Sequence, residues 1–225
     1  MATFPGTVYP DQIYIIGGHY DSYSSGNPML LAPGADDNAS GTTAALEIAR
    51  AMKAANYQPE STIKFIAFAA EELMITGDSG SKYFAQTANA TGMDIKLMIN
   101  NDMISHTYSP VGNSRVAINY YSGFYHLLDI ATFVTNNYSA IRAVNGTQNQ
   151  WSDSYPFWLN GFPAIYFEEN DFSPYYHTPQ DVISNYSMEF CAEIVKASGA
   201  LLMYMIQTPA IVEGFQVLDN GTGHS

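Results

Sequence analysis

The sequence is poor in cations and cysteine, and each scarcity excludes a class of protein. Only 8 of the 225 residues are lysine or arginine, and the formal net charge is −13. Nucleic acids and anionic membranes attract cationic surfaces, so neither is an expected partner. A single cysteine, Cys191, allows neither an intrachain disulfide nor a cysteine-rich zinc site. No apolar run reaches the roughly 18 residues that a membrane span needs, so membrane insertion is not expected.

Apolar residues, by contrast, are plentiful. They make up 47% of the chain, which is enough for one sizeable core. We expect a single domain over residues 1–208. The following residues, 209–225, contain a strand-like run at 211–218 and then Asp-Asn-Gly-Thr-Gly, and we interpret them as a tail or linker.

Strand-like and helix-like segments alternate along the chain. Short apolar runs rich in β-branched residues predict strands at 13–16, 63–70, 95–99, 116–120 and 164–167. Apolar residues at helical spacing predict helices at 40–54, 81–88, 124–134 and 188–206. This alternation predicts an α/β fold with a mostly parallel, mixed sheet sandwiched by helices. In such sheets, ligands bind beyond the carboxyl ends of the strands.

Clusters of polar, chemically reactive residues occur where these strands end. They are His19-Tyr20-Asp21, Asp36-Asp37, Glu71-Glu72, Asp102 and His177. Taken singly, each has an ordinary explanation as a turn, a helix cap or a solvated surface. Taken together, two histidines and at least three carboxylates on one rim would repel one another unless a cation lay among them. Imidazole and carboxylate groups are ligands that suit zinc, so the sequence predicts a metal site.

Five motifs, in order along the chain, resemble those of metallopeptidase family 28. They read His-Tyr-Asp-Ser, Gly-Ala-Asp-Asp-Asn-Ala-Ser-Gly, Ala-Glu-Glu, Asn-Asp-Met and His-Thr-Pro-Gln-Asp, and the resemblance covers roughly residues 10–206. The sequence is similar in particular to the di-zinc aminopeptidases of the bacterial leucyl aminopeptidase type. The resemblance implies the zinc-exopeptidase (phosphorylase/hydrolase-like) architecture, two Zn²⁺ ions, and peptide substrates cut at the N-terminal bond.

The resemblance also assigns roles to individual residues. It implies that Asp37 bridges the two zinc ions, that His19 and Asp102 complete one site, and that Glu72 and His177 complete the other. Glu71 would be the general base that takes a proton from the attacking water. Asp21 would accept a hydrogen bond from His19, so that the other nitrogen of the ring faces the metal.

The substrate pocket is less well marked in the sequence. By resemblance, Met103, Phe167 and Tyr176 would line it, although plain core positions explain them equally well. We expect an uncharged or apolar first residue in the substrate. The sequence departs from the family at Ser152-Asp153-Ser154, where Ser-Asp-His is frequent. Asp153 therefore either supports the metal site or caps a helix.

Two other functions remain open at the level of sequence. One is a glutaminyl cyclase-like acyltransferase, and the other is a non-catalytic binding domain of the transferrin-receptor kind. The filled ligand set and Glu71 favour the hydrolase. Family members usually carry further sequence before the His-Tyr-Asp strand. We therefore expect a longer precursor that is exported to the periplasm or the extracellular space, with a cytoplasmic location as the alternative.

Overall fold

One mixed sheet of seven strands forms the centre of the computed structural model, which describes residues 1–207 apart from the side chains of 74–76. The strand order is β1-β3-β2-β4-β7-β5-β6. The strands are β1 (Ala2–Phe4), β2 (Tyr9–His19), β3 (Ser61–Phe68), β4 (Asp94–Asn101), β5 (Arg115–Tyr120), β6 (Arg142–Asn145) and β7 (Ala164–Glu169). The expected tail at 209–225 lies outside the described residues.

The middle of the sheet is parallel and its edges are mixed. Strands β3, β2, β4 and β7 are parallel neighbours. Strand β1 runs antiparallel to β3, and β5 runs antiparallel to β7 while pairing in parallel with β6. The predicted α/β fold with a mostly parallel, mixed sheet is confirmed. Because four neighbouring strands end on the same side, the residues that follow them share one rim.

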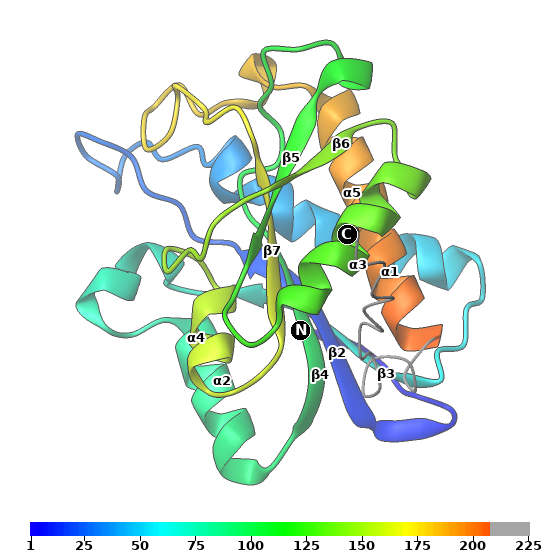
Figure 1. Cartoon of the computed structure of the whole chain (residues 1–225). Coiled ribbons are helices and arrows are strands. Elements are labelled where there is room, and N and C mark those ends of the chain that lie inside the picture. Colours follow the sequence, from blue (N-terminus) through cyan, green and yellow to red (C-terminus); the bar gives the residue numbers. More distant parts are fainter. Residues whose placement is uncertain (208–225) are drawn as a thin grey trace, which may run out of the picture.

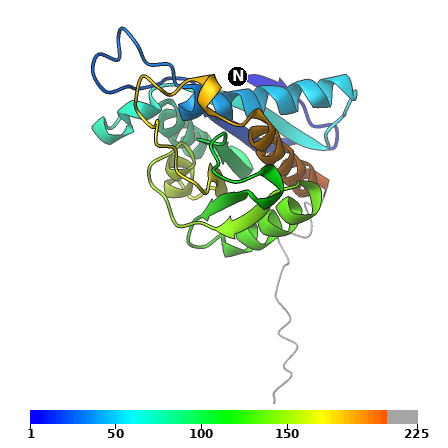
Figure 2. The same ribbon diagram turned by 90° about the horizontal axis from the view of Figure 1, so that it is seen from above.

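Helices cover both faces of the sheet (Figures 1 and 2). On one face lie α1 (Gly41–Ala54), α3 (Tyr125–Tyr138) and α5 (Met188–Gln207), and on the other lie α2 (Gly80–Thr91) and α4 (Ser154–Leu159). In β2, Ile16 packs into the first layer and Ile15 into the second, and both are fully buried. Burial on both faces explains why this strand reads as an uninterrupted apolar run. No helix within residues 1–207 is long and apolar enough to cross a membrane.

The start of α1 packs directly against the end of β4, and glycines make this possible. A Cβ at Gly41 would lie 1.9 Å from the carbonyl oxygen of Asn101, and a Cβ at Gly18 would lie 2.5 Å from the same oxygen. Side chains at either position would push helix and strand apart. The close approach brings the turn Ala35–Ser40, which precedes α1, against the ends of β2 and β4.

Three short elements, β1, β6 and α4, were not predicted from the sequence. The two strands lie at the edges of the sheet and have three and four residues, too few for a periodic pattern. Helix α4 has six residues and contains Pro156, which is tolerated in a first turn but reads as a breaker in sequence. The strand predicted at 63–70 ends earlier, at Phe68, because the chain turns at Ala70, where φ is +58°.

Candidate metal centre

Five ionisable side chains meet on the rim formed by the carboxyl ends of the parallel strands. Each follows a different strand or lies in the turn before α1. They are His19 at the end of β2, Asp37 in the turn Ala35–Ser40, Glu72 after β3, Asp102 after β4 and His177 after β7. We call these five residues the metal cluster.

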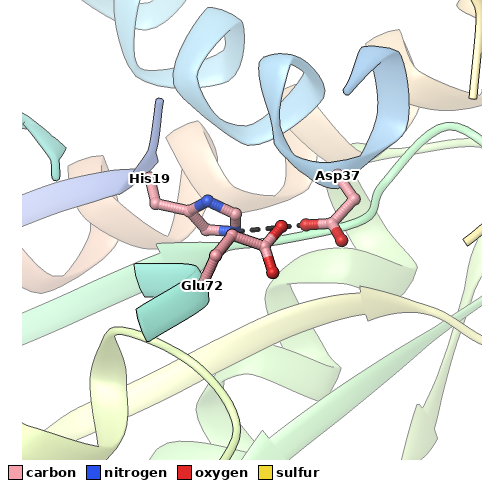
Figure 3. A group of neighbouring side chains, drawn as sticks. All are labelled: His19, Asp37 and Glu72. Carbon is pink, nitrogen blue, oxygen red and sulfur yellow. Dashed lines mark ion pairs between the residues drawn. The ribbon is translucent and has the colours of Figure 1, made fainter. Parts of the chain in front are cut away.

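Asp37 lies at the middle of the metal cluster, with a histidine on each side. Its Oδ1 atom is 3.2 Å from Nε2 of His19, and its Oδ2 atom is 3.2 Å from Nε2 of His177. The carboxylate of Asp37 points toward the ring of His19 from the opposite side of the site to β2 (Figure 3). The two oxygens of one carboxylate are therefore divided between two imidazoles.

Each histidine also has a second carboxylate beside it. Nε2 of His19 is 3.4 Å from Oδ1 of Asp102, and Nε2 of His177 is 2.9 Å from Oε2 of Glu72. The ligand atoms of His19, Asp37 and Glu72 lie within 4.8 Å of one another (Figure 3). The cluster thus consists of two nitrogen–oxygen sets that share Asp37.

The close contacts in the metal cluster do not have hydrogen-bond geometry. Four of its atoms are buried and have no hydrogen-bond partner among the described residues: Nε2 of His19, Nε2 of His177, Oε1 of Glu72 and Oδ1 of Asp102. Buried polar atoms are costly when they are unsatisfied, and such atoms in native proteins usually mark a bound ion, a water or a reactive group. Imidazole nitrogens and carboxylate oxygens arranged in this way are a donor set that zinc accepts.

The pKa values in the cluster reflect crowded negative charge. Burial alone lowers the pKa of His177, but the close carboxylates of Asp37 and Glu72 outweigh burial and raise it to about 9. The pKa of His19 is likewise well above its usual value, because the opposing effect of burial is exceeded by Asp102, Asp21 and Asp37. Burial raises the pKa of Asp37, but the two histidines lower it to about 2. Positive charge between these carboxylates is strongly favoured.

Glu71 lies beside the metal cluster. Its Oε2 atom is 3.9 Å from Nε2 of His19, farther than either carboxylate oxygen that flanks this nitrogen. Burial, with the negative charges of Asp102, Asp153 and Glu72, raises the pKa of Glu71 to about 9. A cation bound among these carboxylates would oppose this rise, and Glu71 must be ionised to accept a proton.

Asp21 organises both the histidine and the glutamate pair. Its two carboxylate oxygens accept hydrogen bonds from the backbone N–H groups of Glu71 and Glu72, each at 3.1 Å. Nδ1 of His19 lies 3.0 Å from the backbone carbonyl oxygen of Asp21 and 3.6 Å from its carboxylate. The hydrogen bond expected at the carboxylate thus goes to the carbonyl, because the carboxylate is already turned toward the two amides. Nδ1 carries the proton in this arrangement, and Nε2 faces Asp37.

The backbone around the site is unusual. Within residues 1–207, four residues other than glycine have a positive φ, and three of them border or belong to the cluster: Ala70 (58°), Met103 (52°) and His177 (55°). Ala70 precedes Glu71, and Met103 follows Asp102. Left-handed backbone at residues with a side chain is unfavourable and concentrates at functional sites.

A cavity of about 340 Å³ opens onto the metal cluster. It is lined by Asp37, Glu71, Glu72, Asp102, Met103, Asn149, Trp151, Tyr166, Glu168, Phe172 and Tyr176. Met103 and Tyr176 lie where the sequence-based interpretation expected them. Phe167 does not, since it is fully buried in the core on the α1, α3 and α5 side. The reason is strand alternation: Tyr166 and Glu168 point to the cavity side of β7, so Phe167 must point away from it.

A scan against known families matches the chain to peptidase family M28 over residues 1–202. The chain belongs to this family. A probable leucine aminopeptidase from Trichophyton verrucosum is 31% identical over 222 residues, which cover 93% of this chain and 56% of the relative. A probable zinc metalloprotease from Pyrenophora tritici-repentis is 43% identical over 117 residues, covering 51% of this chain and 26% of the relative.

Solved structures of aminopeptidases share the fold. An aminopeptidase from Aneurinibacillus sp. superimposes with a TM-score of 0.72 at 26% identity, over 91% of this chain and 47% of that one. A zinc aminopeptidase from Bacillus subtilis superimposes with a TM-score of 0.70 at 26% identity, over 91% of this chain and 49% of that one. The chain spans about half the length of the relatives and structures it matches over most of its own length.

Ser152 contacts the metal cluster of this M28 chain, although the sequence analysis assigned it no role. Its hydroxyl donates to Oδ2 of Asp102 at 2.6 Å and accepts from Nδ2 of Asn100 at 2.5 Å. The bond leaves Oδ1 of Asp102 facing His19. Asp153 is fully buried next to Ser152, and neither of its oxygens has a hydrogen-bond partner among residues 1–207. It occupies the N-cap position of α4 without capping the helix, so the cap interpretation fails.

A second group of buried acids lies behind the metal cluster, and we call Asp36, Glu169 and Asp181 the acid cluster. Asp181 accepts hydrogen bonds from the backbone N–H groups of Asp36 and Asp37, at 2.9 and 3.2 Å, and from the hydroxyl of Tyr186 at 2.7 Å. It therefore holds the turn that carries Asp37. Nothing in the local sequence marks this contact, because the turn that Asp181 binds is 145 residues away.

Asp36 and Glu169 are two neighbouring carboxyl groups of the acid cluster, and both have raised pKa values. Burial raises the pKa of Glu169 to about 11, helped by the neighbouring carboxyl of Asp36. Burial also raises the pKa of Asp36, to about 6, against the hydrogen bonds from Ser105. Ser105 donates its backbone N–H and its hydroxyl to Oδ1 of Asp36, at 2.9 and 2.5 Å. Oδ2 of Asp36 is buried and has no hydrogen-bond partner among the described residues, which also disfavours the ionised form.

Two of the remaining histidines lie apart from the metal cluster. Nδ1 of His106 is 2.8 Å from the carbonyl oxygen of Asp171, and its ring packs edge-on against Tyr108. His106 is thus a polar neighbour of the site. His126 lies in α3, away from the strand ends. His224 lies outside the described residues.

Proposed function

We propose that this chain carries the active site of a zinc-dependent aminopeptidase, which holds two zinc ions and hydrolyses the N-terminal peptide bond of peptides. The proposal rests on the positions of the two carboxylate oxygens of Asp37. Its two oxygens face two different histidines, and each histidine has its own second carboxylate. A carboxylate placed in this way can bridge two cations, whereas a single-metal site has no use for the second set.

The two metal sites follow from these pairs. His19, Asp37 and Asp102 would hold one zinc ion, and His177, Asp37 and Glu72 would hold the other. The choice of zinc is supported by the donor set and by the four buried ligand atoms that lack hydrogen bonds. It is also supported by relatives described as a zinc metalloprotease and a zinc aminopeptidase.

Residues of the chain supply proton transfer and orientation. When bound, the metal ions supply the Lewis acidity that activates a water and polarises the scissile carbonyl. Glu71 accepts the proton of that water and returns it to the departing amine. Asp21 positions Glu71 and Glu72 through their backbone N–H groups, and Ser152 turns Oδ1 of Asp102 toward His19.

The charge of the cavity favours substrates with a free N-terminus. Four of the residues that line it are carboxylates of the metal cluster or Glu71. A substrate's α-ammonium group brings positive charge into this crowded region, whereas an acylated N-terminus does not. Binding of the free amine next to the hydrolytic centre would limit cleavage to the first peptide bond.

Hydrolysis of leucine p-nitroanilide and of its N-acetylated counterpart tests the proposal. We expect turnover of the free-amine compound only, loss of activity with a chelator, and recovery when zinc is added back. Cleavage of the acetylated compound alone would reject the N-terminal assignment. Cyclisation of N-terminal glutaminyl peptides in place of hydrolysis would favour the acyltransferase. No turnover of either compound by zinc-loaded protein would favour the non-catalytic binding domain.

A further inference from the structure

One carboxylate in the cavity belongs neither to the metal cluster nor to the catalytic step. Glu168 lies near the end of β7, on the same face as Tyr166, and lines the cavity together with the metal ligands. Its neighbour Glu169 points to the opposite face, into the acid cluster. Strand alternation therefore gives the two adjacent glutamates separate environments, and only Glu168 faces a bound substrate.

Glu168 is held in place by neutral groups. Nδ2 of Asn119 donates to Oε2 of Glu168 at 2.7 Å. Asn119 is itself fixed, because its Oδ1 atom accepts the backbone N–H of Thr147 at 2.9 Å and a Cβ at Gly146 would lie 2.3 Å from the same atom. A hydrogen bond with Tyr166 also lowers the pKa of Glu168. The carboxylate thus has a defined position before any substrate arrives.

No cation within residues 1–207 forms a salt bridge with Glu168. Burial raises its pKa, the negative charge of Asp102 raises it further, and the hydrogen bonds of Asn119 and Tyr166 oppose the rise. An ionised carboxylate in such a place is costly until a positive charge comes next to it.

The other walls of the cavity suit an apolar stem. Met103, Trp151, Phe172 and Tyr176 line it, and the three aromatic side chains are 62%, 54% and 40% exposed. Lysine and arginine carry a cationic head on a chain of methylene groups, which packs against apolar surface while the head reaches a polar partner. Aromatic faces also attract such cations. The cavity volume of about 340 Å³ leaves room for a long side chain.

We propose that Glu168 determines specificity, and that it selects peptides whose first residue is lysine or arginine. The inference rests on the proposed aminopeptidase function, since it assigns this cavity to the first side chain of the substrate. It replaces the sequence-based expectation of an uncharged or apolar first residue. That expectation considered Phe167, whereas the cavity contains Glu168.

The test compares p-nitroanilides of lysine and norleucine, which have the same stem length and differ in the terminal cation. With zinc-loaded protein, kcat/KM for lysine should exceed that for norleucine. Glu168→Gln keeps an acceptor for Asn119 but removes the charge. It should lower kcat/KM for lysine and arginine substrates by about 10-fold to 100-fold and leave norleucine and leucine nearly unchanged. Activity on leucine shows at the same time that the variant is folded.

Asp129→Asn is the matched control, because Asp129 is exposed on α3 and its replacement changes the net charge equally. It should leave the preference for lysine intact. An equal loss on all substrates in Glu168→Gln would overturn the inference and point to the α-amine as the partner of Glu168. A wild-type preference for norleucine would overturn it too, while the chelator-sensitive hydrolysis of both compounds would leave the proposed function standing. Absence of chelator-sensitive hydrolysis of every anilide would reject both.

Discussion

The metal cluster and the acid cluster bury negative charge side by side and stabilise it in different ways. They are joined at one peptide bond, since Asp36 belongs to the acid cluster and Asp37 to the metal cluster. In the acid cluster, backbone N–H groups and hydroxyls satisfy all the carboxyl oxygens except Oδ2 of Asp36. In the metal cluster, histidines face the carboxylates and four buried atoms remain without hydrogen bonds.

The difference separates a structural group of acids from a reactive one. A network whose atoms are nearly all engaged holds its residues in place and has little capacity left for a ligand. A network with unsatisfied atoms pointing inward is incomplete without a cation. We therefore interpret the acid cluster as a structural group that holds the turn at Asp37 in place. The metal cluster is the reactive group that this turn positions.

Replacing the two neighbouring aspartates separately breaks this comparison most directly. Asp37→Asn removes the shared carboxylate charge, and its amide nitrogen cannot coordinate a cation. We expect bound zinc to fall from two equivalents to at most one, and hydrolysis of leucine p-nitroanilide to fall to the level of chelated wild-type protein. Elemental analysis of dialysed protein and a rate assay measure both effects.

Asp36→Asn serves as the control for that experiment. Its amide oxygen can still accept from the backbone N–H and the hydroxyl of Ser105, and its amide group carries no charge to bury. It should keep two equivalents of zinc. If Asp36→Asn lost zinc as completely as Asp37→Asn, the division into two clusters would be wrong.

The second prediction separates ligands from the base within the reactive group. Glu71→Gln has the shape of glutamate but cannot take a proton, so kcat should fall by about 10²-fold to 10⁴-fold. Zinc content should stay at the wild-type value, because Glu71 lies outside the two ligand sets. Steady-state kinetics and elemental analysis on the same preparation check this. Wild-type kcat in the variant would remove Glu71 from the mechanism.

The third and smallest effect concerns the titration of Asp36 in the acid cluster. The pKa of Asp36 is about 6 in the folded protein and 3.8 for the ordinary group, so the folded state binds this proton more tightly. The stability that it contributes is complete below about pH 4 and is lost as the pH rises through about 6. Asp36→Asn removes this titration. As the pH rises over this range, the free energy of unfolding of the wild type should therefore fall by about 1–3 kcal/mol more than that of the variant.

Urea unfolding of chelated protein at pH 4.5 and pH 7.5 measures that difference. The chelator removes the separate pH dependence of metal binding. Identical pH dependence in the wild type and in Asp36→Asn would show that the pKa of Asp36 is not raised in the folded protein.

Sequence patterns were sufficient for the central strands and for the ligand candidates. Strand β2 is buried on both faces, so its apolar run could be recognised without knowing its partners. His19, Asp37, Glu72, Asp102 and His177 could be selected because reactive residues at strand ends share one rim in a parallel sheet. The resemblance to metallopeptidase family 28 then assigned the roles, and the family itself is confirmed.

Interactions between distant segments could not be predicted in the same way. Asp181 binds the backbone of Asp36 and Asp37, and Ser152 binds Asp102 across 50 residues. Neither contact leaves a local pattern, because each depends on where a loop crosses the rim. The sequence also did not determine which residues of β7 face the cavity. Phe167 and Glu168 are adjacent, and only the structure shows that Glu168 faces the cavity and Phe167 faces the core.

The order of apolar runs and polar strand ends was enough to determine the fold class and the chemistry of the rim, since both follow from local patterns and from the geometry of parallel sheets. Tertiary structure alone decided the distances within the metal cluster, the supporting contacts of Asp21, Ser152 and Asp181, and the presence of Glu168 in the cavity. The physical reason is that these depend on packing between segments far apart in the chain. The close approach of α1 to β4 at Gly41, which brings the turn of Asp37 to the ends of β2 and β4, is the clearest example.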